Sequence, residues 1–509
     1  MGRPHRRHPL ASQRLFLCMN IFSKAPSYFL TRLAFQRALA FVYLVAFVVT
    51  AQQFKALIGH NGLLPARLFV EHAPFWQSPS IFFWNSSDLC LALLAWAGVG
   101  VSFFALTGYS ERFGKAVSAL TWFFLWAVYL SFVNIGQTWY SFGWETMLCE
   151  AGFLCIFLGS SDVRPPTVMI WMLRWMLFRT MLGAGLIKLR GDACWRDLTC
   201  LQVYFETQPV PNLLSAWFHH LPAALLKMGV LFNHFVELAL PFGFFISGPV
   251  AVAAGLATAL FQLILIVSGN LSFLNYFTIA LCIPCLDDRF LSKVIRIQKP
   301  ILVEAGPVRS GILVCLSAVI VLLSIPPTMN LLSKDQVMNT SYDPFRLVNT
   351  YGMFGGVTHE RFEVIVEGTE DRLGLSTSDW KEYEFFAKPG DPNRRPPLMA
   401  PYHRRLDWLM WFAAMGPWQY QPWFLNFTAK LLENDKDVLS LLRKNPFPDA
   451  PPQWVRATLY RYHFATSEEH RKTGAYWVRE RARPFFPAVR LDEPSYRAAL
   501  REMGWTRES

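Results

Sequence analysis

Long runs of apolar residues, each near the length that crosses a lipid bilayer, constrain this chain more than any other feature of its sequence. A helix needs about 20 mostly apolar residues to span the hydrocarbon core. Nine segments are candidates, of which the fourth and eighth are short: residues 34–52, 88–107, 116–135, 144–159, 168–187, 229–247, 250–268, 271–286 and 310–327. The sequence therefore predicts a polytopic helical membrane protein.

The composition divides the chain into unequal parts. Hydrophobic residues make up 53% and aromatic residues 16% of the 509 residues, more than an ordinary soluble domain carries. The apolar runs end near residue 328, and the remainder is polar and rich in Pro and Trp. We expect a basic cytoplasmic leader at 1–33, a transmembrane domain of about nine spans at 34–328, and an extracytoplasmic or lumenal α+β domain at 329–509. The expected fold class is a multi-span α-helical membrane bundle followed by a soluble α+β C-terminal domain.

Sequence patterns in the last third support that α+β prediction. RFEVIVEG, residues 361–368, alternates as a strand does, and WKEYEFFAKPGD, residues 380–391, looks like a second strand closed by a turn. Residues 405–415 and 427–445 carry apolar residues at helical spacing. The aromatic side chains here form either a core or a partly exposed patch for a partner protein; they include Trp408, Trp411, Trp418, Trp423, Trp454 and Trp477.

Basic residues predict the orientation, because Lys and Arg in short loops stay on the cytoplasmic side. They gather in the leader and in the loop after the eighth candidate span: Arg3, Arg6, Arg7, Arg14, Lys24 and Arg32, then Arg289, Lys293, Arg296, Lys299 and Arg309. The loop at 188–227 and the C-terminal domain then lie outside. The net charge of +12 therefore has a topological meaning, and the chain carries no nucleic-acid motif.

Two cysteines in that outside loop are candidates for a disulfide. Cys194 and Cys200 flank Trp195 in GDACWRDLTC, and disulfides persist in extracytoplasmic compartments. The alternative is a pair of free thiols. Cys282 and Cys285 have the C-x-x-C spacing of redox enzymes, but they end an apolar run, which favours core packing.

Several ionisable residues fall inside the predicted spans, where charge is costly and usually paired. If the fourth and fifth spans form an antiparallel hairpin, equal depth pairs Glu150 with Arg179 and Glu145 with Lys188, and leaves Arg174 without an obvious partner.

His234 and Glu237 are three residues apart on one face of the sixth span. They are either an intramembrane active or metal site or, as we favour, hydrogen-bonding groups that hold helices together.

Catalytic signatures are missing from the sequence. It contains no G-x-S-x-G, no Gly-rich phosphate loop and no H-E-x-x-H, and no four of its nine cysteines have the spacing of a zinc site. We therefore expect no catalytic residues, no metal and no cofactor.

Six segments resemble the lipase maturation factor family, in order and with similar spacing from roughly residue 30 to roughly residue 487: WYSFGWETMLCEAGFL, MLGAGLIKLRGDACWRDLTCLQVYFETQPVPN, NHFVELALPF, LIVSGNLSFLN, VNTYGMFGGVTHERFEVIVEGT and YEFFAKPGDPNRRPPLMAPYHRRLDWLMWFAA. The resemblance implies a multi-pass protein of the endoplasmic reticulum membrane. It also implies a non-enzymatic, chaperone-like role in the folding and assembly of secreted lipases such as lipoprotein lipase. The expected partners are a secreted lipase client and membrane lipid, without nucleic acid.

Two expectations remain open at this level. The leader is short and the chain ends without a K-D-E-L-type address, so a prokaryotic source would place the protein in the bacterial inner membrane instead. The alternative function is a membrane enzyme that uses Glu145, Glu150, Arg179, His234 and Glu237, encouraged by a remote similarity to the membrane domain of vitamin K-dependent carboxylase. A cavity lined by these side chains would favour the enzyme, and a fully paired cluster would favour the maturation factor.

Overall fold

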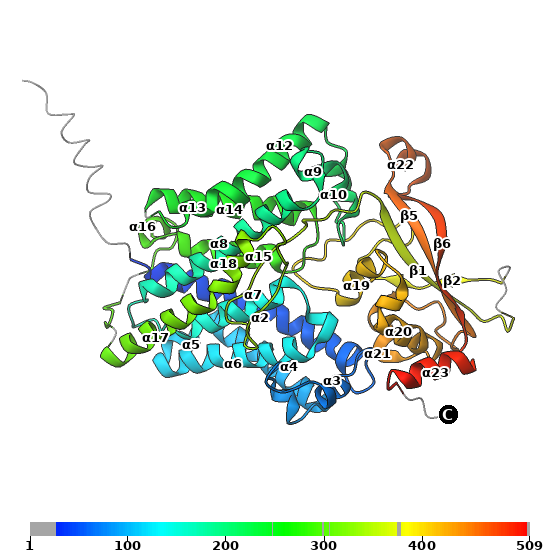
Figure 1. The fold of residues 1–509 in the computed structure, drawn as a ribbon, viewed down its shortest axis with the longest axis horizontal. Coiled ribbons are helices and arrows are strands. Elements are labelled where there is room, and N and C mark those ends of the chain that lie inside the picture. The colour runs from blue at the N-terminus through cyan, green and yellow to red at the C-terminus, as the bar shows by residue number, and fades with distance from the viewer. Residues whose placement is uncertain (1–26, 247, 298–299, 305, 374–377, 506–509) are drawn as a thin grey trace, which may run out of the picture.

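Two parts of different architecture make up the molecule: a bundle of apolar helices, and a C-terminal region in which a sheet and short helices pack together (Figure 1). The structure is a computed structural model that describes residues 27–246, 248–297, 300–304, 306–373 and 378–505. Most of the expected leader, including Arg3, Arg6, Arg7, Arg14 and Lys24, lies outside these residues, as does Lys299. The fold class expected from the sequence is confirmed.

Seven helical runs in the described part of the chain are long and apolar enough to cross a membrane. They have mean hydropathies between 1.2 and 2.4. The runs are α2 (Phe29–Ile58), α4 (Asp88–Thr107), α6 (Lys115–Ile135), α8 (Thr167–Arg190), α12 to α13 (Ala223–Gly243), α14 (Pro249–Ser268) and α17 to α18 (Pro307–Leu332).

The sequence contains nine candidates, and two of them form helices that are too short to meet this length criterion. The fourth candidate is α7 (Gly143–Ile156), which has 14 residues, and the eighth is α15 with the short turn after it (Leu274–Cys285). A helix of 14 residues is only about 21 Å long, which is less than the hydrocarbon thickness. Both helices are thus short, as the sequence already indicates for these two candidates.

Both short helices nevertheless connect the same two ends of the bundle as the long ones. At one end, the Asp288 carboxylate accepts hydrogen bonds from the backbone N–H of Phe29 (2.9 Å) and of Leu30 (2.7 Å) at the start of α2. At this end also, Ser161 N–H donates to the Glu111 carbonyl at 3.1 Å. The C-terminal ends of α15 and α7 thus lie at the level at which α2 begins. The basic loop that is predicted to be cytoplasmic starts at this same end of the bundle.

The C-terminal region is built on a four-stranded antiparallel sheet in the order β2-β1-β5-β6. Its strands are β1 (Arg361–Thr369), β2 (Lys381–Glu382), β5 (Trp454–Phe464) and β6 (Trp477–Val489). In β1, Val364 and Val366 point to one face and join the core formed with α19 (Arg405–Ala413) and α20 (Pro422–Leu432). The strand predicted at 361–368 thus becomes a central strand of this sheet.

Two local predictions in this region need correction. The strand expected at 380–391 reduces to β2 and β3 (Glu384–Phe385), and β3 pairs with β4 (Leu442–Lys444) in a separate two-stranded sheet. The helix expected at 427–445 ends as α20 at Leu432. Asn434 adopts a left-handed backbone (φ 53°), which interrupts the helix, and the Asp435 side chain then caps the short α21 (Lys436–Leu439).

The C-terminal region sits on the end of the bundle where α7 and α15 begin. The Asn270 side chain, just before α15, donates to the Pro397 carbonyl (2.8 Å) and accepts from Met399 N–H (2.8 Å). The Gln53 side chain of α2 donates to the His403 carbonyl at 2.7 Å. Residues 397–405 thus lie at the end of the bundle where the two short helices start. The largest hydrophobic core among the described residues contains side chains from both parts of the molecule.

Candidate functional site

Cys194 and Cys200 form a disulfide in the structure, and their Cα atoms are 4.7 Å apart. Asp192 accepts a hydrogen bond from Cys194 N–H at 2.9 Å and caps the short α9 (Ala193–Arg196). Trp195, between the cysteines, donates from its indole N–H to the Phe354 carbonyl at 2.9 Å. The disulfide loop thus lies at the same end of the bundle as the C-terminal region and contacts it directly.

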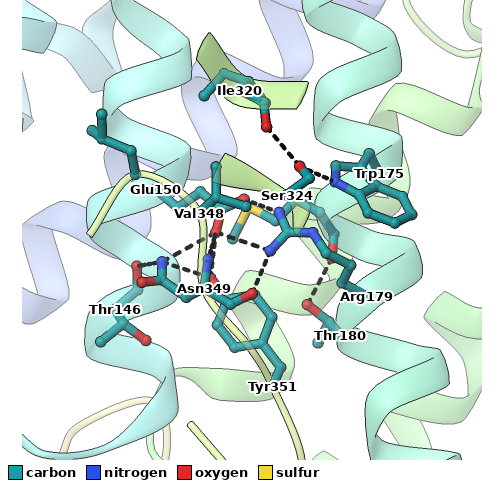
Figure 2. A network of polar contacts seen from close by, with 12 residues as sticks. Thr146, Glu150, Trp175, Arg179, Thr180, Ile320, Ser324, Val348, Asn349 and Tyr351 are labelled. Carbon is teal, nitrogen blue, oxygen red and sulfur yellow. Dashed lines mark hydrogen bonds and ion pairs between the residues drawn. The ribbon is translucent and has the colours of Figure 1, made fainter. Parts of the chain in front are cut away.

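Glu150 of α7 and Arg179 of α8 form a buried ion pair, as depth matching from the sequence predicts. Figure 2 shows that the pair also binds the chain that follows α18. The Glu150 carboxylate accepts hydrogen bonds from Tyr351 OH (2.7 Å) and from the Asn349 backbone and side chain (3.1 Å each), while Arg179 donates to the Asn349 carbonyl. Two buried charges therefore hold residues 349–351 against the bundle.

Glu145 has a different partner from the one that the sequence predicted. Its carboxylate lies 2.8 Å from Arg405 Nη1 and accepts a hydrogen bond from Tyr129 OH. Arg405 also donates to the Trp139 carbonyl at 2.5 Å. Glu145 is the third residue of α7, so it lies at the end of the bundle, where the C-terminal region supplies the cation. The equal-depth argument failed because it considered only the neighbouring helix as a source of charge.

Lys188 does not pair with Glu145, the partner predicted from the sequence, and binds Glu237 instead. Its ammonium lies 2.6 and 2.7 Å from the two Glu237 oxygens and 3.0 Å from Asn233 Oδ1. Glu237 belongs to a single π-helical turn, Phe235–Ala239, which interrupts the regular spacing after α12 (Ala223–His234). His234 does not join this cluster: its Nε2 lies 3.0 Å from the Trp195 carbonyl. His234 and Glu237 thus have separate partners.

His403 lies at the boundary between the bundle and the C-terminal region, and sequence reasoning did not identify it. Its ring is packed edge-on by Phe142, Trp144 and Trp408, with centroids 4.8 to 5.7 Å away. Burial lowers its pKa from 6.5 to about 4, against the opposing effect of Glu145, whose oxygen lies 3.8 Å from Nδ1. The imidazole is therefore neutral at ordinary pH.

A second buried cluster that the sequence did not predict anchors the first strand. Arg361 donates to the carbonyls of Glu206 (2.8 Å) and Gln208 (2.6 Å) in the loop at 188–227 and pairs with Glu363 at 2.5 Å. Lys388 lies 3.0 Å from the other Glu363 oxygen, and burial is the main reason that its pKa is lowered. This cluster links the sheet to the loop that also contains the disulfide.

Arg174, for which the sequence offered no partner, is satisfied by neutral acceptors. Its guanidinium donates to the carbonyls of Pro284 (2.9 Å) and Phe244 (3.1 Å) and to Tyr28 OH (3.3 Å). Carbonyl acceptors cannot be recognised from side-chain identity, so no sequence signal could have identified them.

Potential metal ligands come together at one place in the described chain, at Asp192, Cys194 and Cys200. The two sulfur atoms are bonded to each other, so they are not thiolate ligands. Cys282 and Cys285 are both buried in the core of the bundle.

An apolar groove separates α19 from the rim of the bundle. Three adjoining cavities of about 460, 300 and 470 Å³ make it up, and Trp411 and Met415 line all three. Met338, Met353 and Phe354 from the chain after α18, together with Phe142, Trp144, Trp408 and Phe412, line parts of its wall. Below, this feature is called the groove.

The groove is open, and its walls are adaptable. Met415 is 47% and Phe412 39% exposed, and the chain opposite them contains three glycines, Gly352, Gly355 and Gly356. Unbranched Met side chains and aromatic rings are typical of surfaces that bind varied apolar partners. Of the six tryptophans singled out in the sequence, Trp408, Trp423 and Trp477 are core residues, whereas Trp411 is half-buried and lies in the groove.

Comparison with known proteins identifies the family. Residues 30–293 match the family model described as the lipase maturation factor transmembrane domain, and residues 347–487 match the lipase maturation factor C-terminal domain. The chain belongs to the lipase maturation factor family. The resemblance recognised from the sequence is thus confirmed, and it covers both parts of the fold.

Relatives from this family align over nearly the whole chain. Lipase maturation factor 1 of Mus musculus is 42% identical over 95% of this chain and 90% of its own length, and that of Homo sapiens is 42% identical over 94% and 91%. Lipase maturation factor 2 of Xenopus laevis is 29% identical over 91% of this chain and 83% of its own length. No solved structure matches the chain significantly.

The lipase maturation factor family models include the residues that join the two parts. Glu145, Glu150, Arg179 and Lys188 lie within the transmembrane match, and Asn349 and Arg405 lie within the C-terminal match. Helices α17 and α18 and the chain up to residue 346 lie between the two matches. The matched segments thus meet at the buried ion pairs and line the groove together.

Proposed function

We propose that this chain is a membrane-bound, chaperone-like maturation factor for secreted lipases of the lipoprotein lipase type, and that it acts in the endoplasmic reticulum membrane. Its relatives carry the name lipase maturation factor, and the groove is the observation that supports a binding role most directly. The client, in this proposal, docks an apolar segment against Trp411 and Met415.

The physical character of the groove supports transient binding of an incompletely assembled client. Nine of the 19 residues that line its first part are aromatic or Met, and their side chains recover hydrophobic free energy when a partner covers them. Open apolar walls are costly unless a partner uses them, because about 25 cal/mol is lost per Å² left in water. A subunit that has not yet assembled with its partner exposes apolar surface of the complementary kind.

The arrangement of the intramembrane charges supports a structural role for them rather than catalysis. Glu150 pairs with Arg179, Glu145 with Arg405, and Lys188 with Glu237, so the candidate residues form separate pairs that do not converge on a shared reacting atom. A general acid or base must be within hydrogen-bond reach of its substrate and poised to exchange a proton. Buried ion pairs of this kind hold segments of the chain together instead.

The decisive experiment measures client binding and lipase output together. The full chain is expressed with a secreted lipase in cells that lack their own lipase maturation factor, and we measure co-purified lipase and lipase activity in the medium. Trp411→Ala and Met415→Ser should lower co-purified lipase about fivefold or more, because a buried hot-spot side chain contributes more than 1 kcal/mol to binding. Lipase activity in the medium should fall in parallel.

Trp76→Ala is the matched control, since Trp76 is 82% exposed and lies outside the groove lining. It should leave both readouts unchanged. If the groove variants keep full client binding and lipase output, while His234→Ala or Glu237→Gln abolishes output in a folded protein that still binds lipase, the enzyme alternative replaces this proposal.

A further inference from the structure

A small enclosed cavity of about 60 Å³ lies within the bundle, between α8, the π-helical turn, α14 and α15. The Lys188–Glu237 pair forms one polar wall, and the amide groups of Gln262 and Asn275 form another. A single water needs about 10 to 15 Å³ by the same measure, so the space suits a small polar headgroup. Apolar walls with a few convergent polar groups are the usual construction of a ligand site.

The polar walls of this cavity carry no net charge. All three Lys188 N–H groups are engaged, two by Glu237 and one by Asn233, so none is left for an anionic ligand. Gln262 is different: Oε1 accepts a hydrogen bond from Asn275 at 2.7 Å, while Nε2 contacts only Met181 Sδ at 3.9 Å among the described residues. A sulfur at that distance is a weak acceptor, which leaves an amide donor available at a buried site.

Phe354 and Tyr204 separate the cavity from the groove. Both side chains line the cavity and also the 300 Å³ part of the groove, and their rings meet edge to face at 5.3 Å. Phe354 has a left-handed backbone (φ 55°), which is uncommon for a residue with a side chain, and glycines lie two residues before it and directly after it. Among the described residues, one hydrogen bond joins Phe354 to the disulfide loop. The indole N–H of Trp195 donates to the Phe354 carbonyl at 2.9 Å.

We propose that the cavity is the headgroup site for a neutral amphiphile, a lipid with an apolar chain and an uncharged oxygen headgroup such as a hydroxyl or an ester. The headgroup oxygen accepts a hydrogen bond from the Gln262 side-chain amide, and the apolar chain of the lipid extends past Phe354 into the groove. The paired charges of Lys188 and Glu237 exclude ionic headgroups, because an added buried charge would have no partner. The lipid chain enters the groove in which the proposed function docks the client, but this binding needs no client protein and is measured without one.

The test uses the purified full chain in nanodiscs without any lipase. The probe is a monoacylglycerol with a diazirine on the first chain carbons, and a fatty acid with the same diazirine is the anionic comparison. We expect saturable labelling by the monoacylglycerol of the peptides that contain Thr180–Lys188 or Gln262–Thr278, and at least tenfold weaker labelling by the ionised fatty acid at pH 8.

Three variants at the cavity and one control sharpen the result. Gln262→Leu should weaken labelling about twofold to tenfold, because one hydrogen bond contributes about 0.5 to 1.5 kcal/mol. Ala184→Leu, which fills the cavity, should abolish labelling, and Phe354→Ala should speed it. Trp76→Ala, outside both the cavity and the groove, should leave headgroup labelling unchanged.

The outcome can also overturn the proposal. Labelling confined to lipid-facing peptides, equal labelling by the fatty acid, or full labelling of a folded Ala184→Leu variant would each refute it. Since no client is present, such a failure would leave the maturation proposal standing, and a failure of client binding would leave this one standing.

Discussion

The boundary between the bundle and the C-terminal region has two halves that differ in kind. One half, called here the joint, is closed by the buried ion pairs Glu145–Arg405 and Glu150–Arg179 and by the hydrogen bonds of Asn349 and Tyr351. The other half is the groove, whose Met415 and Phe412 are exposed. The joint fixes where the C-terminal region sits, and the groove keeps apolar surface available.

Stability and binding therefore depend on different residues in this molecule. A buried charge holds its partner to one geometry, because losing the partner leaves an uncompensated charge in low dielectric. An exposed aromatic or Met side chain contributes little to folding, so it can change with little effect on stability. Substitutions in the joint should therefore reduce stability, whereas substitutions in the groove should reduce binding and leave stability nearly unchanged.

The largest expected effect follows from removing one residue of the Glu145–Arg405 ion pair, the most buried pair of the joint. Arg405→Leu leaves Glu145 buried and unpaired and should lower the free energy of unfolding by about 3 to 5 kcal/mol. The double variant Glu145→Leu/Arg405→Leu should recover much of this loss, since neither charge remains. Thermal unfolding in detergent measures both.

Phe412→Ser is the matched change in the groove, and it should stay within about 0.5 kcal/mol of the parent. If Arg405→Leu proves as mild as Phe412→Ser, the two halves do not differ as described.

A smaller effect should appear as pH dependence at the joint. Burial lowers the pKa of His403 from 6.5 to about 4, so between these values the unfolded chain binds a proton that the folded chain lacks. Stability should therefore fall as pH drops from 6.5 towards 4, by about 3 kcal/mol in total from this residue. His403→Phe keeps a ring among Phe142, Trp144 and Trp408 and should flatten this part of the profile. Identical profiles for parent and variant would contradict the assignment.

Sequence reasoning succeeded where interacting residues are near one another along the chain. Glu150 and Arg179 lie in consecutive apolar segments, and equal depth in a hairpin was enough to pair them. Cys194 and Cys200 are six positions apart, so their pairing required only an extracytoplasmic loop. The apolar runs identified the helices themselves, because a bilayer-spanning length of apolar sequence is hard to mistake.

It failed where partners come from distant segments. Arg405 is 260 residues from Glu145 and lies in a polar stretch whose packing against the bundle has no local signal. The groove was equally hidden, since Met338, Phe354 and Trp411 come from segments that only tertiary folding brings together. Hydropathy also measures apolar length and not helix length, so it did not give the 14 residues of α7 or the 9 residues of α15.

The smallest expected effect tests how much each hydrogen bond adds to the joint. Tyr351→Phe removes the hydroxyl that lies 2.7 Å from Glu150, while Arg179 and Asn349 still satisfy that carboxylate. The loss should therefore be about 1.5 kcal/mol, the lower end for a bond to a charged group. Tyr342→Phe is the control, because Tyr342 belongs to the same connecting chain but is 45% exposed, and it should change stability by less than about 0.5 kcal/mol. Equal effects of the two substitutions on thermal unfolding would mean that the connecting chain is held by packing alone. A loss at Tyr351 as large as that of Arg405→Leu would mean instead that the hydroxyl, and not Arg179, keeps Glu150 charged inside the protein.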